Sequence, residues 1–159
     1  MGRSEMNLVE NPAALKKFRR TAWKFQQTFE TPLKDLKRFV STIGQAAGPW
    51  RSASLTIELA VFDPTHLIDL LNANSIPPRY QRGASIVTAG QKEIEALLEA
   101  ALGDWVDFTF VPEPSSFAIY ADHDEFTTFF AQNRSNLNRV VHALSGQGFK
   151  LEKEYRREL

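Results

Sequence analysis

The sequence predicts an α+β fold: an antiparallel β-sheet with helices packed on one face, preceded by an N-terminal helical arm. Apolar residues recur at the helical period in several segments, and short runs of β-forming residues lie between turn residues. The chain has 159 residues, of which 43% are apolar and 24% charged. That composition is typical of a globular protein, and the length suffices for one sizeable core.

Residues 1–46 are predicted to form the arm, a basic amphipathic helix pair. Apolar side chains recur at steps of three or four from Leu15 to Phe29, and the pattern resumes from Leu36 to Ile43. Lysine and arginine occupy the polar side. Such a seam packs against the rest of the chain, a second copy or another protein. The candidate partner contacts on the arm are aromatic: Phe18, Trp23, Phe25 and Phe29.

Residues 52–159 are predicted to form the α+β domain. Strands are assigned where β formers lie between turn residues, and helices where residues such as Ile94 and Leu97 share one side. Gly103 and Gly146 are expected to end two of the helices. The predicted elements, in order, are a strand at 54–62, a short helix that begins at Asp63-Pro64, a loop over 72–83, a strand at 86–87, a helix at 91–102, strands at 105–111, 116–121 and 126–130, a helix at 134–145 and an edge strand at 149–155.

The three strands between residues 105 and 130 are expected to form an antiparallel meander, because turn residues separate them. If residues 63–89 are an insertion, the remaining order is similar to the split βαβ arrangement of ferredoxin-like domains. The similarity concerns topology alone, and such folds carry many different functions.

Composition excludes several classes of protein. The chain has no cysteine, which rules out disulfides, thiolate zinc sites, iron–sulfur clusters and a cysteine nucleophile. No apolar run approaches the roughly 20 residues that span a bilayer, so no transmembrane segment is expected. Membrane association is not expected either, because no lipidation pattern adds a second anchor to the predicted arm. The first residues lack the apolar stretch of a secretory signal, so the expected location is cytoplasmic.

Charge is balanced overall but segregated along the chain. The 19 basic and 19 acidic residues give a net charge of zero. Residues 1–51 hold ten basic and four acidic side chains, whereas residues 52–133 hold three basic and twelve acidic ones. The middle of the chain is therefore expected to present an acidic surface that suits a basic partner. Nucleic acid is not expected as the partner, because the isoelectric point of about 6.8 lies below the usual basic range.

The densest polar cluster is Asp122-His123-Asp124-Glu125, between two predicted strands. One interpretation is a solvated hairpin turn, since aspartate is a turn former. The other is a divalent-metal site, with Asp122, His123 and Asp124 as candidate ligands and His123 and Glu125 as candidate catalytic groups.

The sequence predicts a non-enzymatic, cytoplasmic protein-binding or regulatory module, inhibitory or immunity-like in one form, without a cofactor. Its partner would be another protein or a second copy of the chain. The first alternative is a small metal-dependent hydrolase or transferase that uses residues 122–125. The second alternative is a nucleic-acid accessory protein that uses the basic arm.

Overall fold

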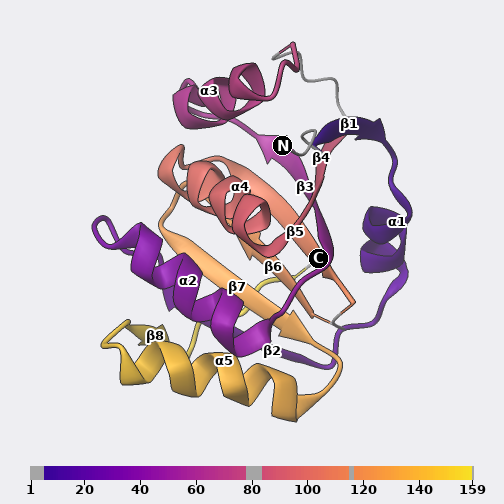
Figure 1. Cartoon of the computed structure of the whole chain (residues 1–159). Coiled ribbons are helices and arrows are strands. Elements are labelled where there is room, and N and C mark those ends of the chain that lie inside the picture. Colours follow the sequence, from indigo (N-terminus) through magenta and orange to yellow (C-terminus); the bar gives the residue numbers. More distant parts are fainter. Residues whose placement is uncertain (1–5, 78–83, 115–116, 159) are drawn as a thin grey trace.

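Eight strands form one antiparallel sheet in the computed structural model, which describes residues 6–77, 84–114 and 117–158 (Figure 1). The order across the sheet is β1-β4-β3-β5-β6-β7-β2-β8. The strands are β1 (Asn7–Glu10), β2 (Phe25–Glu30), β3 (Ser52–Leu59), β4 (Ala84–Ala89), β5 (Asp107–Glu113), β6 (Phe117–Ala121), β7 (Phe126–Ala131) and β8 (Leu151–Glu152). The helices are α1 (Ala13–Arg20), α2 (Leu36–Ala47), α3 (Thr65–Ala73), α4 (Gln91–Gly103) and α5 (Arg134–Gly146). Within the described residues, no helix has the length and apolar composition that crossing a membrane requires.

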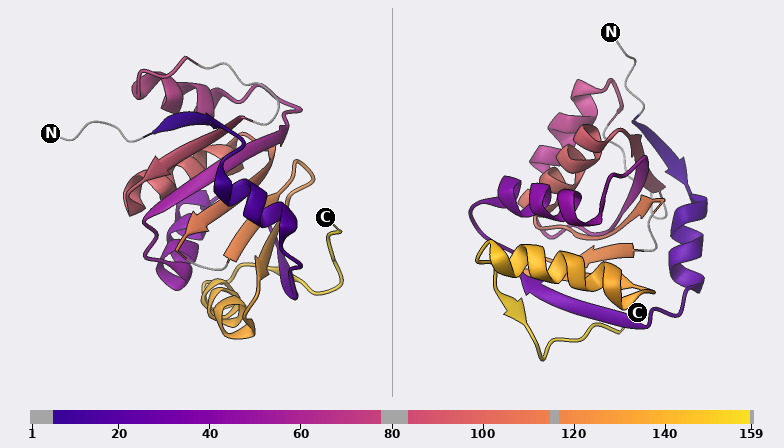
Figure 2. Two further views of the ribbon diagram at one scale, coloured as in Figure 1. Left: turned by 90° about the vertical axis from the view of Figure 1, so that its right-hand side faces the viewer. Right: turned by 60° about the horizontal axis from the view of Figure 1, so that its bottom comes forward.

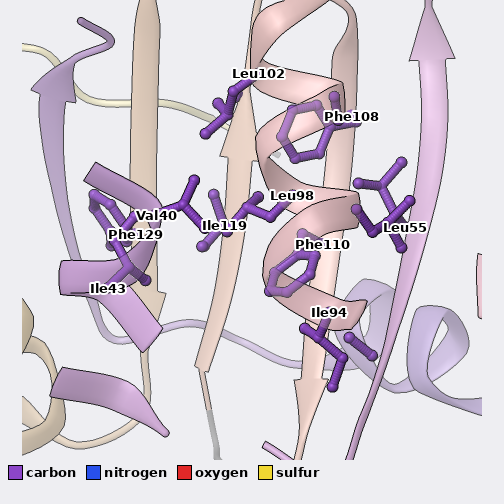
Figure 3. Packing of buried hydrophobic residues seen from close by; sticks show 14 of the residues in the cluster. Val40, Ile43, Leu55, Ile94, Leu98, Leu102, Phe108, Phe110, Ile119 and Phe129 are labelled. Atoms are coloured by element: carbon purple, nitrogen blue, oxygen red, sulfur yellow. The ribbon is translucent and has the colours of Figure 1, made fainter. Parts of the chain in front are cut away.

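One side of the sheet, which we call the closed face, is covered by α2, α4 and α5, and α3 packs against α4. Apolar side chains of these helices and of the strands form one buried cluster. Figure 3 shows this packing, with Val40 and Ile43 from α2, Leu98 from α4, and Ile119 and Phe129 from the sheet. Burying one such side chain stabilises the fold by about 1.5–3 kcal/mol. The closed face is therefore the main source of stability.

The opposite side of the sheet, which we call the open face, carries only α1 and the C-terminal segment among the described elements. Figure 2 shows α1 apart from α2, α4 and α5. Phe18 of α1 is buried in a small second cluster with Val111, Ala118 and Phe130 of the sheet. The α+β class and the antiparallel sheet are thus confirmed, but the helices lie on both faces rather than one.

The predicted N-terminal helical arm is wrong. The described chain begins with strand β1, α1 ends at Arg20, and Phe25–Glu30 forms strand β2 between β7 and β8. At the end of α1, Thr21 has extended backbone, and its hydroxyl donates a hydrogen bond to the Lys17 carbonyl at 2.6 Å. The seam from Leu15 to Phe29 is therefore divided between a helix and a strand.

The physical reason is that a spacing of four residues fits both structures. Phe25 and Phe29 share one side of a helix, but they also share one face of a strand, where alternate residues point the same way. Aromatic and β-branched residues such as Trp23 and Thr28 favour a strand. Pairing along the whole length of β7 then fixes β2 in the sheet.

The second helix of the predicted arm exists as α2, but it continues past the apolar pattern, which stops at Ile43, and ends at Ala47. Gly44 lies inside α2, where an added Cβ would stand 2.7 Å from a carboxylate oxygen of Glu95 on α4. Strands β1 and β2 belong to the same sheet as the rest of the chain. The division into two units, residues 1–46 and residues 52–159, stays a prediction. Truncation of the chain can test it.

Helices α3, α4 and α5 and the β5-β6-β7 meander are confirmed. The predicted edge strand at 149–155 is shorter in the structure and comprises Leu151–Glu152. Beyond it the chain turns toward the open face, where Arg157 binds Asp122. Trp105, expected to begin a strand, instead lies in a turn with a φ of 54°. The predicted strand start at Ser116, and residues 78–83 of the predicted loop, lie outside the described residues.

Candidate functional site

A row of hydroxyl groups crosses the open face. The register of six neighbouring strands aligns one hydroxyl residue from each: Thr28, Thr128, Tyr120, Thr109, Thr56 and Ser85. Thr28 and Thr128 share a hydrogen bond of 2.8 Å, and Thr56 bonds to Ser85. All but Tyr120 are buried. This hydroxyl row gives the open face a polar floor, in contrast to the apolar closed face.

The loop from Asp122 to Glu125 at one edge of this floor is a hairpin turn between β6 and β7. The Oδ1 atom of Asp122 accepts hydrogen bonds from the backbone N–H groups of Asp124 (3.0 Å) and Phe126 (3.2 Å). The Asp122 N–H donates to the Phe126 carbonyl at 3.1 Å. These are the contacts of a turn closed by its own aspartate. They hold the Asp122 carboxylate, which is 8% exposed, toward the open face.

The second oxygen of Asp122 binds an arginine from the end of the chain. Its Oδ2 atom accepts a hydrogen bond from Nη2 of Arg157 at 2.9 Å, and the hydroxyl of Tyr155 stands 3.4 Å away. Both side chains of the ion pair are largely buried, with 12% of Arg157 and 8% of Asp122 exposed. Removing one partner from a buried pair is costly, because the other charge is left without compensation.

Three further residues of the sheet hold Arg157. Its Nε atom donates to the Thr128 hydroxyl at 3.2 Å, and its guanidinium lies 4.5 Å from the centre of the Tyr120 ring. The amide of Gln26 pairs with the backbone of Arg157 in both directions, at 2.7 Å and 3.0 Å. We call Gln26, Tyr120, Asp122 and Thr128 the arginine cradle. The cradle thus contacts one arginine at its charged guanidinium group and at its backbone.

A hollow of about 290 Å³ lies beside the cradle, under α1. Thr109 and Tyr120 line it from the sheet, Glu58 lines it from the end of β3, and Phe18, Arg19 and Thr21 line it from α1 and its end. Glu58 accepts a 3.4 Å hydrogen bond from Thr109 and lies 3.7 Å from Arg19. Tyr120 belongs to both the hollow and the cradle, so the two lie next to each other.

Three carboxylates act on Tyr120, those of Asp107, Glu58 and Asp122. Burial raises the pKa of Tyr120, and the nearby carboxylates of Asp107 and Glu58 raise it further, while Arg157 acts in the opposite direction. These carboxylates belong to β5 and β3 and point to the same face as the hydroxyl row. The site therefore favours a cation over an anion.

His123 is oriented by Asp107. One Asp107 oxygen lies 2.7 Å from Nδ1 of His123 and accepts the His123 backbone N–H at 2.9 Å. Nε2 of His123 is 3.6 Å from Asp124. The hydrogen bond to Asp107 raises the pKa of His123, so the imidazolium form is favoured. The pair fixes the hairpin turn against β5 and puts a titratable group at the edge of the site.

The same geometry recurs at α3, where its role is structural. Asp104 is buried and contacts Nδ1 of His66 at 2.6 Å, while it accepts the backbone N–H groups of His66 and Leu67 at 3.0 and 2.8 Å. These N–H groups belong to the first turn of α3, which has no internal partners for them. Asp104 therefore caps α3 from a distant part of the chain. An aspartate–histidine pair in this fold is thus not by itself a sign of catalysis.

The candidate metal ligands do not converge in the structure. Asp122 faces Arg157, His123 faces Asp107, and Asp124 is exposed. Glu125 is half-buried at a φ of 74° in the turn. Within the described residues, no group of three or more histidine, aspartate or glutamate side chains could hold a metal ion.

The four aromatic candidates of the predicted arm are separated. Phe29 is fully buried in the closed face, and Phe18 is buried under α1. Trp23 is half-buried, stands 5.6 Å from the Phe18 ring and donates to the Phe18 carbonyl at 3.2 Å. Phe25 lies under the guanidinium of Arg134 at 5.0 Å. They do not form one surface for a partner.

Sequence reasoning missed most of the arginine cradle. Gln26 and Arg157 are 131 positions apart, and no local pattern connects them. One signal was available: Asp122 continues the alternation of Ala118 and Tyr120 along β6, which places it on the same face. Comparisons with models of known protein families, with curated proteins and with solved structures find no match for this chain.

Proposed function

We propose that the protein is a non-enzymatic protein-binding or regulatory module that takes a basic segment of another protein on its open face. The observation that carries this proposal is the acidic site around Tyr120, which already holds a guanidinium. Acidic side chains at a recessed site steer cationic partners toward it and reject anionic ones. A cytoplasmic location and an inhibitory, immunity-like role remain predictions from the sequence.

The carboxylates near Tyr120 support this choice. Glu58, Asp107 and Asp122 all raise the pKa of Tyr120, so all three act on the same region. Of the cations, Arg157 is engaged by Asp122 at 2.9 Å and the imidazolium of His123 lies 2.7 Å from Asp107, while Arg19 stands farther from Glu58, at 3.7 Å. A basic segment could therefore add ion pairs without displacing every existing one.

The two alternatives have less support. The metal-dependent hydrolase or transferase needs Asp122, yet both oxygens of that carboxylate already accept hydrogen bonds from the turn and from Arg157. The nucleic-acid alternative depended on a helical arm, and the basic residues of that region are divided between α1, α2 and their connections. Both stay predictions.

Affinity capture with the full-length chain, followed by purification of the captured protein and calorimetric titration, tests the proposal. The charge variant is Glu58→Gln with Asp107→Asn. The control is Asp63→Asn with Asp69→Asn, which removes the same charge from exposed positions at α3. We expect a partner with a basic segment whose dissociation constant rises about tenfold or more between about 50 and 300 mM salt. The charge variant should weaken binding more than the control.

Two results would contradict the proposal. A partner that binds the charge variant and the wild type equally contacts another surface. A partner that is weakened equally by the variant and the control responds only to net charge.

A further inference from the structure

We propose that the arginine cradle is a recognition site for one arginine in an extended segment of the partner, and that the chain's own C-terminal residues 155–158 occupy it in the partner's place. This inference rests on the proposed function and names the chemistry of the bound segment. It also implies that the partner must displace the C-terminal segment before it binds.

The residues of the cradle are held in place by contacts that do not involve the C-terminal segment. Thr128 is held by Thr28 across β2 and β7, and Asp122 is held by the N–H groups of its own turn. Tyr120 and Gln26 stand on β6 and β2 within the sheet. These contacts remain when Arg157 leaves, so a largely buried carboxylate then lacks its counter-ion and favours another cation.

Two of the described residues hold the C-terminal segment on the sheet, Tyr155 by its side chain and Arg157 by its side chain and backbone. Beyond β8 the chain forms no helix or strand in its described part. Tyr155 stacks on Phe126 with 4.4 Å between ring centres, and Arg157 enters the cradle. The intervening Arg156 and the following Glu158 are exposed. Release of this segment therefore breaks no strand pairing.

The contacts of the cradle select arginine over lysine. The guanidinium donates to Asp122 and to Thr128 from different nitrogen atoms, while its central carbon lies over the Tyr120 ring. A lysine ammonium is a point charge without this planar fork, and it cannot make the same set of contacts at once. Gln26 adds recognition of an extended backbone, since it binds both the N–H and the carbonyl of the residue that carries the guanidinium.

The hollow next to the cradle extends beyond the surface that the C-terminal segment contacts. The hollow beside Tyr120 is lined by α1 and the sheet, and no residue of the C-terminal segment lines it. Glu58 and Thr109 there can bind a polar or cationic neighbour of the incoming arginine. A partner segment would thus gain contacts that residues 155–158 do not make.

The test uses full-length Arg157→Ala, with Arg156→Ala as the matched control, because Arg156 is the neighbouring exposed arginine. The probe is the acetylated and amidated peptide Lys-Glu-Tyr-Arg-Arg-Glu, which copies residues 153–158. A second peptide carries citrulline, a neutral isostere, in place of the second arginine. Binding is measured by calorimetry, and the site by NMR shifts of Tyr120 and Thr128.

In the wild type and in Arg156→Ala, the attached C-terminal segment competes with the peptide for the cradle at an effective concentration of the order of millimolar. Both proteins should therefore bind the arginine peptide weakly. Arg157→Ala should bind it about tenfold or more tightly than either, and the citrulline peptide should lose about tenfold or more of that affinity. If Arg157→Ala folds poorly, Arg157→Lys keeps a charge beside Asp122 and is compared in the same way.

Equal binding of the peptide by the variant and the wild type, or equal binding of the arginine and citrulline peptides, would overturn the inference. The cradle would then serve only to anchor the chain's own end. The proposed function is judged separately, since it stands or falls on the Glu58 and Asp107 variant with the captured partner.

Discussion

The two faces of the sheet differ in what holds them together. On the closed face, side chains such as Phe29, Phe129 and Ile119 are fully buried under three helices. On the open face, a hydroxyl row, one buried ion pair and a small apolar cluster take their place. Apolar burial is non-directional, whereas hydrogen bonds and ion pairs depend on individual partners. The closed face thus supplies stability, and the open face supplies specific polar groups at which binding can occur.

The largest expected effect comes from removing residues that serve both faces. A fragment that begins at Ser52 lacks β1 and β2 from the sheet, α1 from the open face and α2 from the closed face. It loses the buried Phe29, Phe39 and Ile43, so we expect no cooperatively folded state. Near-ultraviolet circular dichroism and NMR dispersion measure this. A well-dispersed spectrum would instead support the prediction that 52–159 is an independent domain.

A second comparison uses neighbours on β7 that point to opposite faces. Phe129 packs with Phe29 and Phe117 on the closed face, and Phe130 packs with Phe18 and Trp23 on the open face. Phe129→Ala should cost about 3–5 kcal/mol of the free energy of unfolding. Phe130→Ala should cost less, because its cluster is small and Trp23 is half-exposed. Urea denaturation gives both values, and a larger loss for Phe130→Ala would reverse the assignment of the two faces.

A third comparison separates the buried ion pair from the exposed charge beside it. Arg157→Ala leaves the carboxylate of Asp122 without its counter-ion and should cost about 3 kcal/mol, the lower end for a buried pair, because Arg157 is 12% exposed. Arg156→Ala should change the free energy of unfolding by no more than about 0.5 kcal/mol. Chemical denaturation of both variants under one set of conditions measures the difference. Equal effects would mean that the cradle contributes nothing beyond net charge.

The smallest expected effect is a pH dependence at the edge of the open face. The hydrogen bond to Asp107 raises the pKa of His123 above its unfolded value. The resulting stabilisation is fully present below the unfolded pKa of about 6.5 and is lost as the pH rises through the folded pKa. The difference in unfolding free energy between wild type and His123→Gln should therefore shrink from about pH 6 to about pH 9. Asp107→Asn should remove this trend, and a difference that grows with pH would contradict it.

Sequence patterns identified those elements in which the spacing of apolar residues fits either a helix or a strand but not both. Ile94, Leu97, Leu98 and Ala101 fit a helix and no strand, and α4 forms there as predicted. Phe25 and Phe29 satisfy both periods, so the choice between helix and strand depended on pairing with β7, which lies about a hundred residues away.

The site was harder to predict than the fold. Asp122 was identified as a candidate, but its partner Arg157 is 35 positions away in a segment without regular structure. Tyr120 and Thr128 resemble many other strand residues until the register places them side by side. Ion pairs and cradles of this kind depend on tertiary contacts, which a single sequence does not encode locally.

The hydroxyl row has a consequence for how the strands find their alignment. If a strand such as β7 slipped by one residue, Thr128 would turn into the apolar layer and Phe129 would enter the polar floor. Thr28 would then lose the oxygen with which it shares a hydrogen bond. Each misaligned pairing would thus place unfavourable side chains on both faces of the sheet at once. The hydroxyl row therefore disfavours incorrect strand register during folding.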